Sequence, residues 1–457
     1  MGKRKIGIIG FGKTGKALLS FFRNDPNVSD IIIFDDKDPD LSGITYDQDS
    51  TEFVTGIEGI KKLAGSDIVI ISPGVNGREE RFLYLKEAGV RIVSEIEFAS
   101  SFIDSGIIAV TGTNGKSTTV SLIHHLLSNS GIDSHLTGNI GVPLISEIGK
   151  INDGSKTVLE VSSFQLEEIE DFRPEITLIL NITPDHLDRY PELQEYINAK
   201  LDILKNLSAE DPVILNYDDP FLRRKFYNKN DGNFKKIWFS TGDTRFEDGA
   251  WMSDGNAVVR MDGDEKIVPL DGNPLIGLHN IENILASFLA VSLMGLSSDQ
   301  MYDALGSFKG LPHRMEICGK KDGVIFINDS KATNIEATVK AISGVESNIA
   351  LILGGKDKGG DFSVLNKFIN KKLKKIILIG EAADSISAGI NSEKAFIARV
   401  DTLDEAMRKG YEVLAGSGGT VLLAPGCASF DMFKNFEERG NTFKEGVRKF
   451  MDEGING

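Results

Sequence analysis

Short runs of β-branched and other apolar residues recur along the chain, and each run ends in glycine or a polar residue. The runs are KIGIIG, DIIIFD, SDIVIISPG, GIIAVTG, KTVLEVSS, ITLILNIT, GVIFIND, IALILGG, KKIILIG and GTVLLAPG. Runs of this kind are typical of buried parallel strands, and the segments between them have helical patterns. Strands that alternate with helices predict α/β architecture, in which ligands bind beyond the carboxyl ends of the strands.

The pattern divides the chain into three blocks, which suits its length of 457 residues. We expect domains at residues 1–96, 97–310 and 311–457. As the family resemblance described below implies, the first and third blocks are expected to be Rossmann-like domains, and the second a P-loop-type ATPase domain with a mainly parallel sheet. Within the second, the turn-rich stretch from Ser240 to Gly277 is expected to be β-rich.

Composition narrows the function classes. A net charge of -16 argues against a general nucleic-acid binder, because neutralising a phosphate backbone needs a basic face. Two cysteines, Cys318 and Cys427, cannot build a disulfide framework, which fits a reducing cytoplasm. No apolar run approaches the length that spans a bilayer. We therefore expect a cytoplasmic protein that neither binds nucleic acid nor inserts into a membrane.

The stretch VTGTNGKSTT resembles a phosphate-binding loop, but only Thr113 and Asn114 separate its first two glycines. It lies between a predicted strand and a predicted helix, so backbone N–H groups and a helix N-terminus would face an anion. Lys116 adds a positive charge, and the Ser117 hydroxyl lies where a magnesium ligand is expected. An ordinary glycine turn is the alternative, but it needs neither the lysine nor the hydroxyls that follow.

A second loop, GFGKTG at Gly10 to Gly15, also follows a strand and begins a helix. Asp35 and Asp36 end the next strand, at the spacing of a dinucleotide-binding fingerprint. The alternative is a tight strand-to-helix turn that binds no dinucleotide.

Hard oxygen ligands for magnesium are available near the first of these loops. Glu160 lies in an otherwise apolar strand, where a carboxylate is costly unless it is paired or metal-bound. A salt bridge is the alternative. The following strand, expected beside that of Glu160, leads into PDHLDRY and would bring Asp185, His186 and Asp188 to the same sheet edge.

The segment ELQEYINAKLDILKNL predicts a helix with Lys200 on its apolar stripe. The stripe comprises Leu193, Ile197, Leu201 and Leu204. From the pattern alone, Lys200 is expected to snorkel from the edge of the buried face.

The third block places three glycine- and lysine-rich loops directly after strands. They are INDSKATN, LGGKDKGGDF and LLAPGCASFDMFKNFEERG. Loops of this composition at strand ends indicate sites for anionic groups.

Together these motifs resemble the Mur ligases, the ATP-dependent amide-forming enzymes of peptidoglycan synthesis, over nearly the whole chain. The motifs that carry the resemblance are GTNGKST, GNIG, EVSSFQLE, NITPDHLDRY, AKLDI, HNIEN, GLPHRME, NDSKATN, GGKDKGGDF and APGCASFDMFKNFEERG. Within the family, the chain is most similar to the members that add D-glutamate. GTNGKST is the family's own ATP loop, and GFGKTG is then expected to hold a UDP-sugar rather than NAD.

The resemblance implies that D-glutamate is joined to UDP-N-acetylmuramoyl-L-alanine through an acyl phosphate, with ATP and two magnesium sites. The expected catalytic residues are Lys116, Glu160, His186 and Lys200, with Lys200 carbamylated. The expected magnesium ligands are Ser117, Glu160, His186 and Lys200. ATP is assigned to Gly112, Thr113, Asn114, Gly115, Lys116, Ser117, Thr118, Asn283, Arg314 and Asp329. The UDP-sugar is assigned to Gly12, Lys13, Thr14, Asp36, Lys37, Ser72, Pro73, Gly74 and Asn139. D-Glutamate is assigned to Lys331, Thr333, Lys356, Ser429 and Phe436.

One position departs from the family pattern. Similar sequences often have Thr-Arg near the uracil, where this chain has Asp36-Lys37. Lysine neither stacks nor forks as arginine does, so the uracil contacts are open. Three other functions also stay open: a folylpolyglutamate synthase-like ligase, a non-catalytic nucleotide-binding relative, and an NAD-dependent oxidoreductase built on the first loop.

Overall fold

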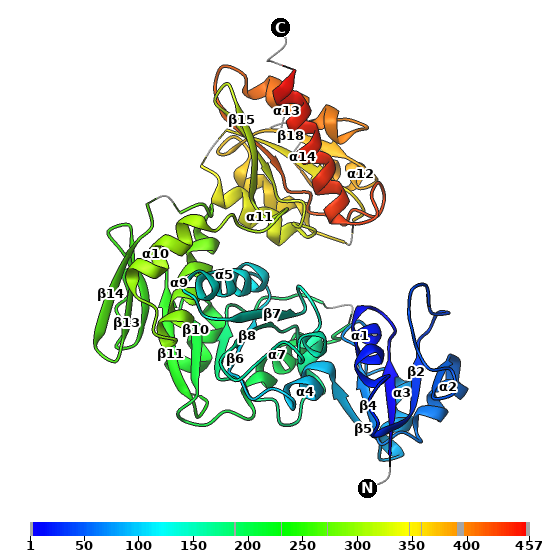
Figure 1. Ribbon diagram of the computed structural model, residues 1–457. Helices are drawn as coiled ribbons and strands as arrows, with labels where there is room; N and C mark the ends of the chain where they lie inside the picture. The colour runs from blue at the N-terminus through cyan, green and yellow to red at the C-terminus, as the bar shows by residue number, and fades with distance from the viewer. Residues whose placement is uncertain are drawn as a thin grey trace. The chain divides into compact units, whose positions relative to one another are not determined.

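The computed structural model describes residues 3–186, 189–229, 231–271, 273–346, 348–357, 359–390 and 397–453. The chain forms two compact units (Figure 1), of which the first comprises Met1–Gly272 and Glu282–Ser307 and the second Asn273–Ile281 and Phe308–Gly457. The first unit holds two sheets and the second holds one. The expected α/β class with mainly parallel sheets is confirmed. The division at residues 96/97 and 310/311 stays a prediction.

The first sheet has five parallel strands in the order β3-β2-β1-β4-β5. The strands are β1 (Arg4–Ile9), β2 (Val28–Phe34), β3 (Thr51–Val54), β4 (Ile68–Ile71) and β5 (Arg91–Ser94), and the helices are α1 (Lys13–Phe22), α2 (Gly56–Leu63), α3 (Glu80–Glu87) and α4 (Glu95–Ser100). The strand order reverses at β1, so the crevice for a ligand opens beyond its carboxyl end. A Cβ at Gly15 would lie 2.1 Å from the Gly10 carbonyl oxygen, so only glycine lets α1 approach β1 this closely.

The second sheet has nine strands in the order β14-β13-β12-β11-β10-β9-β6-β8-β7. The strands are β6 (Ile107–Thr111), β7 (Ser134–Gly138), β8 (Lys156–Glu160), β9 (Ile176–Ile179), β10 (Pro212–Asn216), β11 (Lys235–Ser240), β12 (Gly249–Ser253), β13 (Asn256–Met261) and β14 (Asp264–Pro269). Only β13 is antiparallel to its neighbours, β12 and β14. These three strands confirm the β-rich stretch. One expectation was wrong: β8 and β9 are not adjacent, because β6 lies between them.

Helices of the second sheet's domain surround it. The helices are α5 (Lys116–Asn129), η1 (Leu144–Ser146), α6 (Ser163–Leu166), α7 (Leu193–Leu201), η2 (Asp202–Leu204), α8 (Pro220–Leu222), the π-helix η3 (Arg223–Asn228), α9 (Leu278–Leu293) and α10 (Ser298–Ser307). In α5, Leu122, Leu126 and Leu127 are buried, and the helix packs on β6, β7 and β8 (Figure 1). That packing fixes the N-terminus of α5 just beyond the carboxyl end of β6.

The second unit is a six-stranded sheet in the order β15-β16-β20-β17-β18-β19, parallel except for β15 against β16. The strands are β15 (Glu316–Lys321), β16 (Val324–Asn328), β17 (Ile349–Gly354), β18 (Leu373–Ile379), β19 (Ile397–Arg399) and β20 (Gly419–Leu423). The helices are α11 (Ile335–Gly344), η4 (Phe362–Phe368), α12 (Ala383–Gly389), α13 (Leu403–Leu414) and α14 (Phe436–Asp452). The central strand β17 is buried on both faces, which explains its continuous apolar sequence IALILG.

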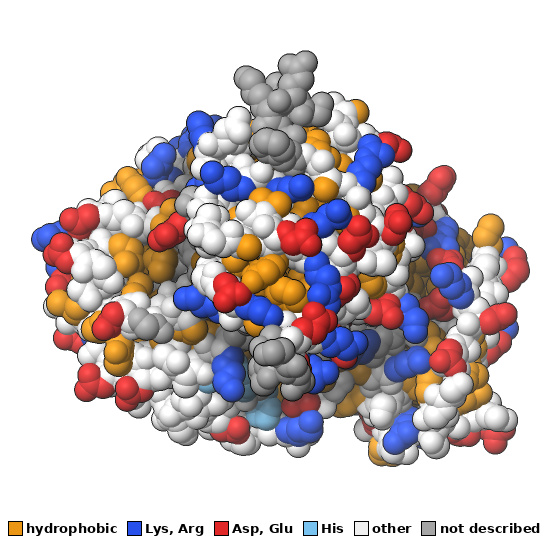
Figure 2. Space-filling view, turned by 90° about the horizontal axis from the view of Figure 1, so that it is seen from above, with side chains coloured by type: hydrophobic (Ala, Val, Ile, Leu, Met, Phe, Trp, Pro, Cys, Tyr) orange, Lys and Arg blue, Asp and Glu red, His pale blue; other side chains and the backbone are white. Residues whose placement is uncertain are grey.

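Charged side chains of both signs lie on the surface of the molecule. On the face shown in Figure 2, lysine and arginine side chains are interspersed with aspartate and glutamate side chains. Among the helices of the described residues, none combines the length and apolar character needed to cross a bilayer.

Helix α4 joins the two sheets of the first unit through two buried carboxylates. Glu95 accepts a hydrogen bond of 2.7 Å from the Ile145 N–H. Glu97 accepts three, from the N–H groups of residues 170, 171 and 172, at 3.0, 3.0 and 2.9 Å. Backbone donors satisfy these carboxylates, so each is held within the domain of the second sheet.

We predict that Glu95→Gln reduces the pH dependence of stability. Burial raises the pKa of Glu95 from 4.5 to about 7. Between pH 4.5 and about 7, the folded chain binds more protons at Glu95 than the unfolded chain does. The contribution of Glu95 to the free energy of unfolding is therefore greatest at low pH and is lost as the pH rises through about 7. At 1.36 kcal/mol per pKa unit the loss is roughly 3 kcal/mol. Glutamine keeps the acceptor without the charge.

The measurement is the midpoint of thermal unfolding at pH 5 and pH 8. The gain of Glu95→Gln over the unsubstituted protein should be larger at pH 8. The exposed Glu87→Gln serves as the control and should show no such difference. An equal effect of Glu95→Gln at both pH values would contradict the prediction.

Candidate functional site

The phosphate-type loop connects β6 to α5. Gly115 has φ +91°, which favours glycine, and a Cβ there would lie 2.4 Å from Asn283 Oδ1. Asn283 comes from α9, far along the sequence, and its Oδ1 also accepts a hydrogen bond of 3.3 Å from Thr119. The structure therefore brings Asn283 to the loop, as expected for an ATP-binding residue.

A second segment holds the loop from the other side. The Thr113 N–H donates to the Asn181 carbonyl at 2.9 Å, and the Asn114 N–H donates to Asn181 Oδ1 at 2.8 Å. The Thr113 hydroxyl donates to the Thr183 carbonyl at 3.0 Å and lies 2.9 Å from the Tyr196 hydroxyl. These two N–H groups therefore fix the loop. The N–H groups at the start of α5, from Gly115 to Thr118, are donors of the type that binds an anion.

Lys116 and Lys200 meet at one carbonyl oxygen. Lys116 Nζ donates to the Gly112 carbonyl at 2.7 Å and to the Thr113 carbonyl at 3.0 Å. Lys200 Nζ donates to the same Gly112 carbonyl at 2.9 Å. Residues from β6, α5 and α7 thus converge at the predicted ATP loop, where the buried Ser117 and Thr118 also lie.

Lys200 does not snorkel. Its side chain is only 2% exposed, and Nζ lies 4.8 Å from the Tyr196 ring centroid. Burial lowers the pKa of Lys200 well below its usual value, with a smaller contribution from the charge of Lys116. The charges of Asp185 and Glu160 oppose this shift. A lysine in this setting holds its amine as a base more readily than an exposed lysine does.

The expected stripe of α7 needs correction. The α-helix ends at Leu201, and a 3-10 turn, η2, continues to Leu204. Leu193 is exposed, whereas Tyr196, Ile197, Ala199 and Lys200 form the buried face. The stripe prediction failed at Leu193 because the first turn of the helix lies at the surface.

Glu160 ends β8 with its side chain 2% exposed. Oε1 accepts a hydrogen bond of 2.8 Å from Asn139 Nδ2, whereas Oε2 has no hydrogen-bond partner among the described residues. A buried carboxylate oxygen without a donor is costly. A divalent cation would satisfy it, and a hydroxyl such as that of Ser117, at the start of α5, is the type of oxygen that magnesium takes. Glu160 and Ser117 therefore fit a magnesium site.

His186 lies on the loop after β9 with φ +53°, and its side chain is about half exposed. The imidazole packs edge-on against the Phe164 ring, with centroids 4.8 Å apart. Its backbone N–H donates to Asp185 Oδ1 at 2.9 Å. Asp188, the third polar residue expected here, lies outside the described residues.

The carboxyl edge of the first sheet carries the residues expected for the UDP-sugar. Gly12, Lys13 and Thr14 are at the start of α1, Asp36 and Lys37 follow β2, and Ser72, Pro73 and Gly74 follow β4. The Ser72 hydroxyl donates to the Gly10 carbonyl at 2.9 Å, and the Phe11 N–H donates to Asp35 Oδ2 at 2.7 Å. These two side chains shape the loop. Lys13 Nζ donates to the Gly141 carbonyl in the GNIG segment that contains Asn139.

Arg81 was missed by the sequence analysis. Its guanidinium forms a two-point pair with Asp36, in which Nη2 donates to Oδ2 at 2.8 Å. This hydrogen bond lowers the pKa of Asp36. Arg81 thus places a fork-shaped cation beside Asp36-Lys37, where the family pattern has its arginine.

In the second unit, three loops with predicted site residues follow the carboxyl ends of strands β16, β17 and β20. Lys331 Nζ lies 4.8 Å from the Phe436 ring centroid. Lys356 and Ala428 exchange backbone hydrogen bonds of 2.8 and 3.0 Å, which brings Lys356 next to the buried Ser429. The Thr333 N–H donates to the Lys331 carbonyl at 2.8 Å. The structure therefore brings together the residues expected for D-glutamate.

Arg314 and Asp329, expected for ATP, also belong to the second unit. Burial raises the pKa of Asp329 to about 6, while a hydrogen bond from the Met315 N–H and the charge of Arg314 oppose this shift. Arg439, which sequence analysis missed, is buried beneath these loops. Its guanidinium donates to Ser330 Oγ at 3.0 Å and to the Cys427 carbonyl at 3.2 Å, so it holds two of the loops together.

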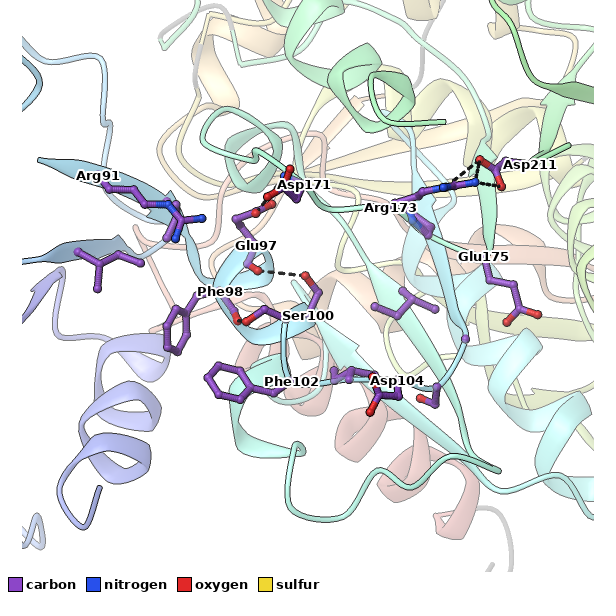
Figure 3. A pocket seen from close by; sticks show the side chains of 18 of the residues that line it. Arg91, Glu97, Phe98, Ser100, Phe102, Asp104, Asp171, Arg173, Glu175 and Asp211 are labelled. Carbon is purple, nitrogen blue, oxygen red and sulfur yellow. Dashed lines mark hydrogen bonds and ion pairs between the residues drawn. The ribbon is translucent and has the colours of Figure 1, made fainter. Parts of the chain in front are cut away.

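A cavity of about 610 Å³ lies elsewhere in the first unit, at the amino ends of its strands. It is lined by residues that begin or precede strands, among them Arg91, Ile107 and Asp211. Figure 3 shows Arg173 paired with Asp211 on one side of this cavity, and Phe98 and Phe102 on another. It contains none of the predicted site residues, because those follow the carboxyl ends of the strands.

The α/β fold and the phosphate-type loop are those of a nucleotide-binding protein, and three family models match its chain. Residues 4–94 match the "Mur ligase MurD-like, N-terminal domain", residues 110–291 the "Mur ligase middle domain", and residues 313–427 the "Mur ligase, glutamate ligase domain". The chain belongs to the Mur ligase family. This confirms the resemblance and favours the ligase over the oxidoreductase alternative.

The relatives of this chain include proteins named UDP-N-acetylmuramoylalanine--D-glutamate ligase, of which two are described here. The protein of Thermoanaerobacter pseudethanolicus is 39% identical over 97% of this chain and 98% of its own length. That of Alkaliphilus oremlandii is 42% identical over 83% of each chain. Among solved structures, MurF ligase from Thermotoga maritima in complex with ADP is 17% identical, with a TM-score of 0.61 over 98% of this chain and 96% of that one. A pseudomurein peptide ligase type C from Methanothermus fervidus is 18% identical, with a TM-score of 0.59 over 98% and 100%. These two share the fold.

Proposed function

We propose that the protein joins D-glutamate to UDP-N-acetylmuramoyl-L-alanine at the expense of ATP, in cytoplasmic synthesis of peptidoglycan precursors. The observation that carries the proposal is the convergence of Lys116, Lys200 and Glu160 around the loop of residues 112–115. The names of the relatives support the choice of substrates.

The reaction would proceed in two steps. The alanyl carboxylate of the UDP-sugar attacks the γ-phosphorus, an O–P bond forms, and the bond to ADP breaks. The amine of D-glutamate then attacks the acyl carbon, loses a proton, and displaces phosphate. Both steps build negative charge on phosphate oxygens, so catalysis depends on positioning and charge neutralisation. Lys116 and the N–H groups at the start of α5 would supply both.

Magnesium would be held by Ser117 and Glu160, and at a second position by His186 and Lys200. Bound there, it would neutralise charge on the phosphate oxygens. An ammonium group offers no lone pair, so Lys200 fits this role only as a carbamate. Its neutral amine would add to carbon dioxide with loss of one proton and become an anionic oxygen ligand. The buried setting of Lys200 supports this step, because burial favours the neutral amine.

The D-glutamate pocket is assigned to the second unit. Lys331 and Lys356 would pair with the two carboxylates, Ser429 and Thr333 would contribute polar contacts, and the Phe436 ring would form an apolar wall. At the first sheet, Asp36 with Arg81 would face the uracil, and Ser72 to Gly74 with Asn139 would face the sugar. The two-point pairing of Arg81 with Asp36 supports a fixed polar surface there.

The test is phosphate release with ATP, magnesium and UDP-N-acetylmuramoyl-L-alanine against a panel of amino acids. We predict that D-glutamate supports turnover, whereas L-glutamate, D-alanine and L-alanine are at least about a hundredfold weaker. A site built for specific polar contacts rejects partners that leave its groups unpaired. If meso-diaminopimelate or L-alanine were the best acceptor, the proposed substrate would be wrong.

A further inference from the structure

Arg189, in the PDHLDRY segment, makes three different contacts although its side chain is only 11% exposed. One nitrogen pairs with Glu167 Oε2. Another, Nη1, donates to the Val75 carbonyl at 3.2 Å. The guanidinium carbon lies 4.0 Å from the centroid of the Phe164 ring. An arginine held in this way has little freedom to move, because each contact fixes a different direction of its plane.

Glu167 is the anchor of this arrangement. Its side chain is 4% exposed, and a second arginine, Arg78, approaches Oε1 with Nε at 3.2 Å. Arg78 also lies over the Tyr190 ring at 5.1 Å. A carboxylate buried between two arginines is stable only while both pairs hold, so Glu167 fixes the position of both cations. Arg78 belongs to the first sheet's domain and Arg189 to the second's.

The two remaining contacts of Arg189 reach separate parts of the proposed active site. Val75 follows Ser72 to Gly74, the segment assigned to the UDP-sugar. Phe164 contacts the imidazole of His186 edge-on at 4.8 Å. A single guanidinium therefore touches the backbone beside the sugar site and the ring that supports His186.

We infer that Arg189 is a positioning residue that sets the distance between the sugar-binding loop and His186. The inference rests on the proposed function. In-line attack requires the substrate carboxylate to meet the phosphate in a narrow geometry, and a misplacement of about 1 Å costs roughly a hundredfold in rate. Arginine suits the position because its planar fork pairs with a carboxylate while its face stacks on a ring. Lysine keeps the charge but provides neither feature.

The main test is Arg189→Lys, measured by steady-state kinetics in each substrate. We expect kcat to fall by about 10- to 100-fold and KM for the UDP-sugar to rise. KM for ATP should stay unchanged, because the contacts of Arg189 described above are with Glu167, Val75 and Phe164, none of which belongs to the ATP loop. The matched control is Arg173→Lys. Arg173 is a more exposed arginine that also pairs two-point with a carboxylate, Asp211, but lies at the opposite strand ends (Figure 3). It should retain normal kinetics.

A second variant separates positioning from folding. Phe164→Leu keeps the charges and removes the ring, so it should lower kcat. The midpoints of thermal unfolding of both Arg189→Lys and Phe164→Leu should stay near that of the unsubstituted protein. Their effects on kcat should be less than additive, because both break one chain of contacts. Normal kcat in both variants, additive losses, or an equal rise in KM for ATP would overturn the inference.

Calorimetric titration with UDP-N-acetylmuramoyl-L-alanine distinguishes this inference from the proposed function. If the unsubstituted protein binds the UDP-sugar but does not turn over with D-glutamate, the function fails while Arg189→Lys should still bind the UDP-sugar more weakly. If the unsubstituted protein turns over with D-glutamate, and Arg189→Lys has the same affinity for the UDP-sugar and the same kcat and KM, the proposed function stands and the proposed role of Arg189 is wrong.

Discussion

Lys200→Ala is expected to lose most activity, and formate is expected to restore part of it. The amine of Lys200 is buried beside Lys116 and within the electrostatic reach of Glu160 and Asp185. As an ammonium group it would repel magnesium, whereas as a carbamate it would bind it. Removing the side chain removes that anion and leaves a space of the size of a small carboxylate. The measurement is phosphate release with and without added formate.

Lys200→Arg is the matched variant for the rescue. Its guanidinium keeps the positive charge and fills the space, so formate should give no gain. Lys200→Ala that turns over at a near-normal rate without any additive would remove this residue from the mechanism. A carbamate on the unsubstituted protein, detected as an added 44 Da by native mass spectrometry in carbon dioxide-saturated buffer, would be an independent sign, with the mass following from the addition of CO₂.

Lys116→Ala is expected to reduce kcat by about a hundred- to a thousandfold, the range seen when one preorganised electrostatic contact is removed from a transition state. Lys116 begins α5, and its Nζ donates to the Gly112 and Thr113 carbonyls of the loop, so its charge lies at the loop where a phosphate would bind. The fold should survive, because the side chain contributes little to the core.

Lys150→Ala is the control for this variant. Lys150 is exposed and pairs with Glu147 three residues earlier, so its loss should leave kcat unchanged. Circular dichroism and the thermal midpoint should match among the three proteins. A folded Lys116→Ala that releases phosphate at the normal rate would exclude the phosphate-loop role.

The strands were predictable because their sequences carry the signal directly. Runs such as IALILG are apolar throughout because β17 is covered on both faces. Strand order was less accessible. The chain runs from β6 through α5 to β7, then back to β8 and across to β9. Each crossover obeys the same local rules whether it skips a strand or not, so adjacency of β8 and β9 could not be decided from their sequences.

Some site residues could be identified from the sequence, and others could not. Glu160 was identifiable because a carboxylate is out of place in an apolar strand, and its buried, half-satisfied carboxylate agrees with that expectation. The helical pattern wrongly predicted that Lys200 snorkels to the surface. The pattern shows which face of the helix is buried, but not which groups of the protein contact that face. Arg81 and Asn181 left no such signal. Exposed arginines are common, and Asn181 acts through the loop that it holds, so only tertiary structure identifies them.

The tie between α4 and the domain of the second sheet has a consequence for how this segment can change by mutation. Glu97 receives its hydrogen bonds from the peptide groups of residues 170 to 172, not from their side chains. Any amino acid except proline supplies a backbone N–H, so most substitutions at these three positions leave the tie intact. The acceptor, in contrast, is a single side chain. Selection to keep these hydrogen bonds therefore constrains the side chain at one position, Glu97. The side chains of residues 170 to 172 can change without loss of the hydrogen bonds.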